Sequence, residues 1–137
     1  MNQKIKTLKI IHLAMVGGVT LGYTILGDFA TIFNMVIDNS SLLYAFIPAI
    51  AYVFGNFMFK NMLQKIQKDA PIEEKFAVYQ SASIVRWAIL EGACFAIMVL
   101  KPDFLLLGVI LLIYLILLAP KESQILQTLG IKDSELQ

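Results

Sequence analysis

Four long apolar stretches constrain the fold of this chain more than any other feature. They cover residues 10–26, 42–59, 82–100 and 104–119. Each approaches the ~20 residues that a helix needs to cross about 30 Å of hydrocarbon. Hydrophobic residues make up 58% of the chain, against roughly 45–50% in ordinary soluble domains. A soluble domain of 137 residues has too much surface to hide so many apolar side chains. The sequence therefore predicts an all-α protein, an integral membrane four-helix bundle, with residues 1–137 forming a single transmembrane domain in a lipid bilayer.

Several functional classes lack support in the sequence. The net charge is only +1, so there is no basic excess to indicate nucleic-acid binding. Cys94 is the single cysteine and His12 the single histidine, which argues against a disulfide framework and against a metal site. We find no HExxH, GxSxG or phosphate-loop motif. We therefore expect no catalytic residues, no metal, no cofactor and no nucleic-acid partner, and an enzyme embedded in the membrane is the least favoured function.

The lysines predict how the chain is oriented. Cytoplasmic loops of membrane proteins carry an excess of lysine and arginine. Nine of the eleven basic residues fall in the N-terminal segment, in the loop between the second and third stretches, or in the C-terminal tail: Lys4, Lys6, Lys9, Lys60, Lys65, Lys68, Lys75, Lys121 and Lys132. This bias predicts that both termini are cytoplasmic, and together with the small size it indicates a bacterial inner (plasma) membrane.

Two segments next to the apolar stretches have apolar residues at helical spacing. Residues 60–69 and 120–130 are therefore predicted to be amphipathic cytoplasmic extensions, which could lie on the inner leaflet or contact a partner. Residues 10–26, which follow three lysines, also fit a signal peptide. Because no A-x-A-like cleavage site follows them, we interpret them as a retained helix.

Small residues recur in the first and third stretches with the same spacing. Each set runs i, i+4, i+8, and the two sets are related by a constant offset of 74 residues, so a duplicated helical hairpin is possible. The two sets are Ala14, Gly18 and Gly22, and Ala88, Gly92 and Ala96. Small residues let membrane helices approach closely. We therefore predict that the first and third helices touch along these two stripes, with the second and fourth helices outside them.

Glu91 is the most informative polar residue in the apolar stretches. It lies near the middle of the third stretch, where an exposed charge is expensive. Two interpretations remain open: Glu91 is a proton or cation site, or it is a hydrogen-bonded residue that fixes helix register. Counting depth along the helices offers the hydroxyls of Tyr52 and Tyr114 as partners for its carboxyl group.

Three further polar residues are expected at a similar depth, nearer the cytoplasmic surface. Arg86, His12 and Asn56 are predicted to form a polar layer in the inner third of the bundle. Arg86 is five residues from Glu91, about 140° around the helix, so an ion pair between them is not expected. For His12 an interfacial role is preferred over a metal site, and Cys94 is interpreted as a small apolar filler.

Residues 69–100, "DAPIEEKFAVYQSASIVRWAILEGACFAIMVL", resemble the loop and ion-binding helix of rotary ATPase proteolipids, the subunit c family. The shared pattern is a polar loop containing a proline, Pro71, followed by an apolar helix with one glutamate among small residues. This resemblance implies that Glu91 carries the ion. The chain departs from the family because its second helix has only Gly55 among several phenylalanines. Small multidrug exporters of four helices are also similar in size, but their carboxylate lies in the first helix, where Gly17 stands here.

These observations lead to two functional hypotheses. The preferred one is a small non-enzymatic integral membrane protein that serves as a subunit or accessory of a membrane assembly, or that forms a homo-oligomer. The alternative is a small proton- or cation-coupled transporter, similar to the proteolipids, that uses Glu91.

Overall fold

The structure, a computed structural model, describes residues 2–132, the Thr31 side chain excepted. Over this range the chain is all-helical and contains no strand, as the sequence predicts. The elements are α1 (Asn2–Leu26), the 3₁₀ turn η1 (Phe29–Thr31), α2 (Leu42–Leu63), α3 (Ile72–Leu100), the 3₁₀ turn η2 (Pro102–Phe104), α4 (Leu105–Leu117) and α5 (Glu122–Leu129).

Three of these helices are long and apolar enough to cross a membrane: α1, α2 and α3. A fourth span exists only if the segment Pro102–Leu117 is joined with α5, and these two are bent by 72°. α4 covers most of the fourth predicted stretch, residues 104–119, but it is too short to be the expected fourth span by itself. With 13 residues, α4 is about 20 Å long. Pro120 follows it, and a proline cannot continue the hydrogen-bonding pattern of a helix.

The bounds of the other helices also differ from the apolar stretches. α1 begins at Asn2 and α3 at Ile72, directly after Pro71, because polar first turns remain helical when the turns beyond them are packed. α2 ends at Leu63, and turns follow it. α5 lies within the predicted amphipathic tail and buries Ile125, Leu126 and Leu129.

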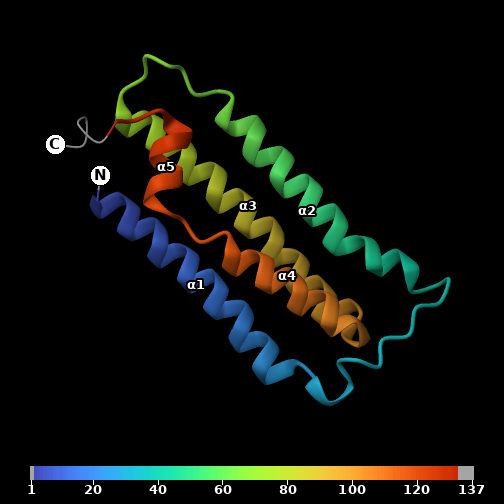
Figure 1. Cartoon of the computed structure of the whole chain (residues 1–137). Coiled ribbons are helices and arrows are strands. Elements are labelled where there is room, and N and C mark those ends of the chain that lie inside the picture. Colours follow the sequence, from blue (N-terminus) through green and yellow to red (C-terminus); the bar gives the residue numbers. More distant parts are fainter. Residues whose placement is uncertain (1, 133–137) are drawn as a thin grey trace.

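α3 occupies the centre of the molecule. It packs against α1, α2, α4 and α5, and its most extensive contact is with α2 (Figure 1). α1 and α2 lie on opposite sides of it. The structure therefore differs from the predicted arrangement, in which the first and third helices formed a central pair.

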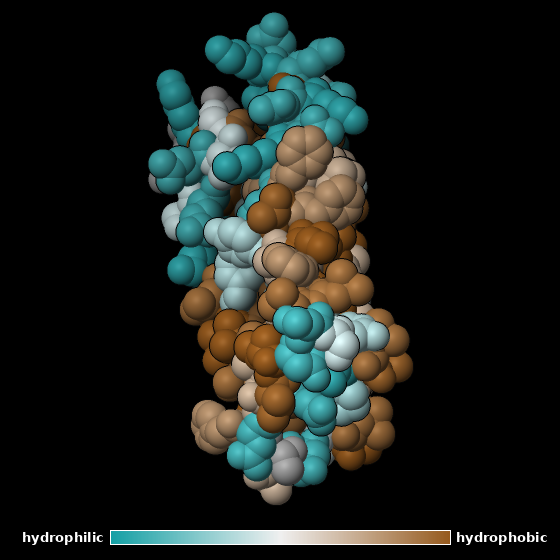
Figure 2. Space-filling view, turned by 90° about the vertical axis from the view of Figure 1, so that its right-hand side faces the viewer, coloured by the Kyte–Doolittle hydropathy of each residue, from teal (hydrophilic) through white to brown (hydrophobic). Residues whose placement is uncertain are grey.

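The segments rich in lysine gather at one end of the molecule. The start of α1, the connection between α2 and α3, and α5 lie together there, while residues 27–41 and the turn between α3 and α4 lie at the opposite end (Figure 1). We call the first of these the lysine-rich end. Between the two ends, hydrophobic residues dominate the surface (Figure 2).

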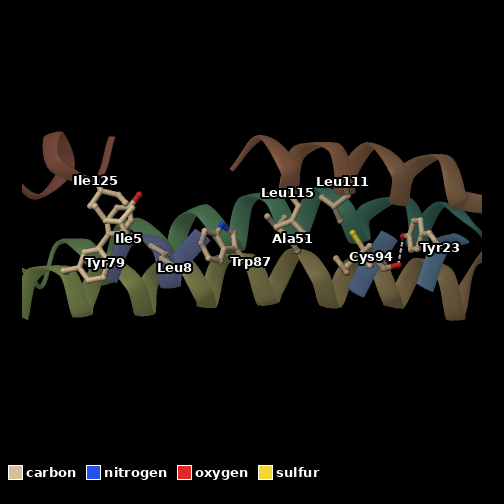
Figure 3. Close-up of a cluster of buried hydrophobic side chains, with 14 of the residues drawn as sticks. Ile5, Leu8, Tyr23, Ala51, Tyr79, Trp87, Cys94, Leu111, Leu115 and Ile125 are labelled. Carbon is tan, nitrogen blue, oxygen red and sulfur yellow. Dashed lines mark hydrogen bonds between the residues drawn. The ribbon is translucent and has the colours of Figure 1, made fainter. Parts of the chain in front are cut away.

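Burial is distributed unevenly over the helices. α3 buries ten residues, whereas α2 buries only Ala51 and Gly55. Large apolar side chains of α2, such as Leu43, Ile50 and Val53, are exposed. The core follows the length of α3, with Trp87 and Cys94 among its fully buried members (Figure 3). Apolar side chains that face outward around a buried core are what a helical protein in lipid requires.

Candidate functional site

Glu91 lies on the side of α3 that faces α1. Its Oε1 is 3.7 Å from the position that a Cβ atom on Gly18 would occupy. The side chain is half-buried, and within residues 2–132 it takes part in no hydrogen bond and no ion pair. The carboxyl group is therefore open on one side rather than enclosed among the helices.

The two tyrosines proposed as partners of Glu91 contact each other instead. The rings of Tyr52 and Tyr114 lie 5.1 Å apart. Asn56 Nδ2 donates a hydrogen bond to Tyr114 Oη at 2.9 Å. The expected bond from a tyrosine to Glu91 is absent from the described part of the chain. Similar depth in the bundle was not sufficient for this hydrogen bond. The tyrosines lie on the side of α3 that carries Arg86, and Glu91, five residues further along the helix, points to a different side.

The two stripes of small residues do not pack against each other as predicted, although Gly18 and Gly22 of the α1 stripe do face side chains of α3. Their exposed members are Ala14, Gly18, Ala88 and Gly92, while Gly22 and Ala96 are half-buried. A Cβ atom on Gly92 would meet nothing within 4 Å, and one on Gly22 would lie 3.0 Å from the Phe95 ring. Larger side chains of α1 also join the two helices, because the His12 ring contacts the Trp87 ring and Tyr23 donates to the Cys94 carbonyl oxygen.

The predicted polar layer is divided between two sides of α3. Arg86 Nη1 donates to Asn56 Oδ1 at 3.5 Å, on the side of α2. His12 is buried elsewhere, with its Nε2 2.8 Å from the carbonyl oxygen of Leu115. Its ring meets Trp87 edge to face at a centroid distance of 4.7 Å. His12 thus joins α1 to the last turn of α4 inside the protein, where the Leu115 carbonyl oxygen also accepts a hydrogen bond from the Leu118 amide at 3.2 Å.

A second contact, which the sequence analysis missed, joins α1, α3 and α4. Tyr23 Oη donates a hydrogen bond to the Cys94 carbonyl oxygen at 2.6 Å (Figure 3). The Cys94 Sγ lies 3.8 Å from the Gly108 carbonyl oxygen. A Cβ atom on Gly108 would collide with the Tyr23 hydroxyl group. Cys94 is fully buried, as a small apolar filler would be, but its backbone also accepts this hydrogen bond. The sequence did contain a feature that could have predicted this contact. Gly108 stands in the most apolar stretch, at a depth in the bundle similar to that of Tyr23.

The described residues were compared with the requirements of a metal site. Between residues 2 and 132, no group of three or more histidine, cysteine, aspartate or glutamate side chains is placed to hold a metal ion. What the arrangement does present is an open carboxyl group among small residues on one side of α3, and a cation, Arg86, on another. No family model, no curated protein and no solved structure matches this chain.

Proposed function

We propose that this chain is a small integral membrane protein that works as a subunit or accessory of a larger membrane assembly. Its helices would span a bacterial inner membrane with the lysine-rich end in the cytoplasm. The three long apolar helices support the first part of this proposal. The start of α1, α5 and the lysine-bearing connection gather at one end (Figure 1), which agrees with the excess of basic residues on the cytoplasmic side of membrane proteins.

One observation carries the proposed role in an assembly, namely the open face formed by α1 and α3. We call Ala14, Gly18, Ala88, Gly92 and the adjacent Glu91 the α1–α3 face. Glu91 is nine residues before the end of α3 at Leu100, or about 14 Å along the helix. If the hydrocarbon layer of about 30 Å ends near Leu100, Glu91 would lie near its middle. A charged carboxyl group left there in lipid costs about 2.5–3.5 kcal/mol on insertion scales.

A partner helix on the α1–α3 face would remove this cost. The exposed small residues allow another backbone to approach closely and gain dispersion contacts. The chemistry of the face defines the partner: an apolar membrane helix of a different protein, with a hydrogen-bond donor at the depth of Glu91. A second copy of this chain is the less suitable occupant, because the polar group that its own α1–α3 face presents at that depth is another carboxyl group.

Native electrophoresis of the tagged protein from its host membrane tests this proposal. The wild type is expected in a complex of defined stoichiometry that contains a second protein. Gly18→Leu and Gly92→Leu are expected to release the chain as a monomer, because their side chains would fill the face. Ala49→Leu, on the outer surface of α2, is the matched control and should leave the complex intact. A wild type that is monomeric, or that forms only homo-oligomers, would contradict the proposed heteromeric assembly.

Transport through Glu91 is the second candidate, and the absence of an internal partner for its carboxyl group favours it. The resemblance to rotary ATPase proteolipids also implies this role. Proton flux driven by a pH gradient in liposomes should then be present in the wild type and lost in Glu91→Gln, although the variant inserts normally. Equal flux in both proteins, or none in either, would count against transport.

A further inference from the structure

Among residues 2–132, no carboxylate forms an ion pair with Arg86. Its guanidinium carbon lies 3.7 Å from the centroid of the Phe59 ring, and its Nη1 donates to Asn56. Both neighbours are neutral. Throughout the described range, no acidic side chain lies within ion-pair distance of Arg86, and the ion pair of Lys101 with Asp103 is at the other end of the molecule. Arg86 Nε is buried and has no hydrogen-bond acceptor there. The guanidinium group is thus oriented by Phe59 and Asn56 but lacks a counter-charge.

A cavity of about 360 Å³ opens beside this guanidinium group. Arg86, Phe59 and Tyr79 form one side of it. The end of α4 and three polar residues of α5 form the other: Gln124, Gln127 and Thr128. The 72° bend between α4 and α5 creates this space, because an α4 that continued straight would not turn the polar residues of α5 toward α3.

A second cavity, of about 450 Å³, continues from the first toward the lysine-rich end. The two share Gln127 and Thr128, and the second is also lined by Lys68 and Lys75. The two cavities thus border the same residues of α5, and each is lined by at least one cation. Apolar residues at the end of α4 border the first cavity, and one of them, Leu117, is 71% exposed on the outer surface.

We infer that Arg86 binds the phosphate group of an anionic phospholipid from the cytoplasmic leaflet. A guanidinium group matches the geometry of phosphate oxygens through paired hydrogen bonds. The amide of Gln127 and the hydroxyl of Thr128 supply further donors, and the lysines of the second cavity attract a lipid of negative charge. The exposed apolar border places acyl chains beside the headgroup, which a free phosphate would not use.

This inference rests on the proposed membrane orientation but not on the proposed assembly. Arg86 opens toward α2 and α4, whereas Glu91 faces α1, so the two sites lie on different sides of α3. Lipid binding can therefore be measured on the isolated protein. A loss of assembly in Gly92→Leu would leave it unchanged.

The experiment measures lipid retained by the purified protein, using native mass spectrometry and thermal stability in nanodiscs. The discs contain phosphatidylcholine alone or with phosphatidylglycerol. The wild type is expected to retain phosphatidylglycerol and to melt at a higher temperature in its presence. Arg86→Gln should weaken this retention about tenfold or more, since a charge-assisted hydrogen bond contributes roughly 1.5–3 kcal/mol. Arg86→Lys should lose less, because it keeps the charge.

Matched variants make the result specific to the cavity. Lys121→Gln removes a lysine that does not line either cavity and should bind phosphatidylglycerol as the wild type does. If Arg86→Gln fails to fold, the pair Gln127→Leu and Thr128→Val tests the same cavity without touching α3, and it should reduce retention. Equal retention in Arg86→Gln and the wild type would overturn the inference. So would equal stabilisation by inorganic phosphate in phosphatidylcholine discs, which would assign the site to a free anion.

Discussion

Two glycines of this chain, Gly108 in α4 and Gly92 in α3, look equivalent in sequence and have opposite surroundings. Each stands inside an apolar helix, Gly108 among large side chains and Gly92 beside Ala93 and Cys94. At Gly108 the missing side chain makes room for the Tyr23 hydroxyl group, whereas around Gly92 the space is open. A small residue allows close approach in a membrane helix, but only the neighbouring helix determines whether that space is used. The difference separates small residues that hold the monomer together from small residues that remain available to a partner.

Gly108→Ala tests the buried half of this comparison and should have the largest effect. The added methyl group would collide with Tyr23, so α1 and α4 must move apart. Overpacking of this kind costs typically 1–3 kcal/mol, and we expect the upper part of that range. Thermal unfolding in detergent checks it, with Gly92→Ala as the control that should leave the melting temperature unchanged. Similar losses in both variants would remove the distinction between the two glycines.

His12→Ala should have the next largest effect, because it frees the end of α4 from α1. The substitution removes the hydrogen bond to the Leu115 carbonyl oxygen and the edge contact with Trp87. We expect a loss of about 1–2 kcal/mol. Hydrogen exchange of the Leu118 and Ala119 amides should accelerate, while the amides in the first half of α4 stay protected. Unchanged exchange at these two positions would show that His12 does not hold this helix end.

Tyr23→Phe sharpens the comparison by removing only the hydroxyl group that Gly108 accommodates. The bond to the Cys94 carbonyl oxygen is lost, and hydrogen bonds between membrane helices average about 0.6 kcal/mol. The expected decrease in stability is therefore smaller than for Gly108→Ala. In the double variant, Tyr23→Phe should recover part of the cost of Gly108→Ala, because the collision is weaker without the oxygen atom. Strictly additive effects in the double-mutant cycle would contradict the proposed collision.

Asp38 allows a test of the turn before α2, outside the membrane-spanning helices. Its titration is expected to have the smallest effect on stability of the changes considered. Its carboxylate accepts hydrogen bonds from Ser40 Oγ and from the Ser41 amide, both at 2.7 Å, and these bonds lower the Asp38 pKa to about 2. Since the folded pKa lies below the unfolded value of about 3.9, this stabilisation is present above about pH 4. It is lost as the pH falls toward 2.

The Ser41 amide resonance in micelles reports this titration. Its chemical shift should change with a midpoint near pH 2, and Asp38→Asn should abolish the change. A midpoint near 4 would mean that the turn before α2 does not hold the carboxylate.

Hydropathy was enough to predict an all-helical chain with several long apolar helices, and the lysine-rich segments do lie at a common end. A long apolar run is compatible with few structures other than a membrane-spanning or buried helix, and α2 is an example of such a run. Helix bounds were less accessible, because the first turns of α3 are polar and depend on packing with α5 for their helical state. Pro120 indicated that the chain would bend after α4. The length of α4 was overestimated because the apolar run continues to Ala119.

The contacts between helices were the least predictable part. Depth along a helix follows from counting residues, but the direction in which a side chain points depends on which helices surround it. Counting placed Tyr114 and Glu91 at similar depths, and the rotation of α3 separated them. The same rotation brought Arg86 to Asn56 and left His12 with Trp87. Spacing suggested that Gly18 and Gly92 face each other, although larger side chains already filled the contact between α1 and α3.

The bend between α4 and α5 also changes the direction of the chain at the lysine-rich end. There α5 runs across the other helices rather than along them (Figure 1). In a bilayer, a helix that lies across the others would occupy area in one leaflet only. The free energy of insertion would then depend on how tightly the lipids of that leaflet are packed.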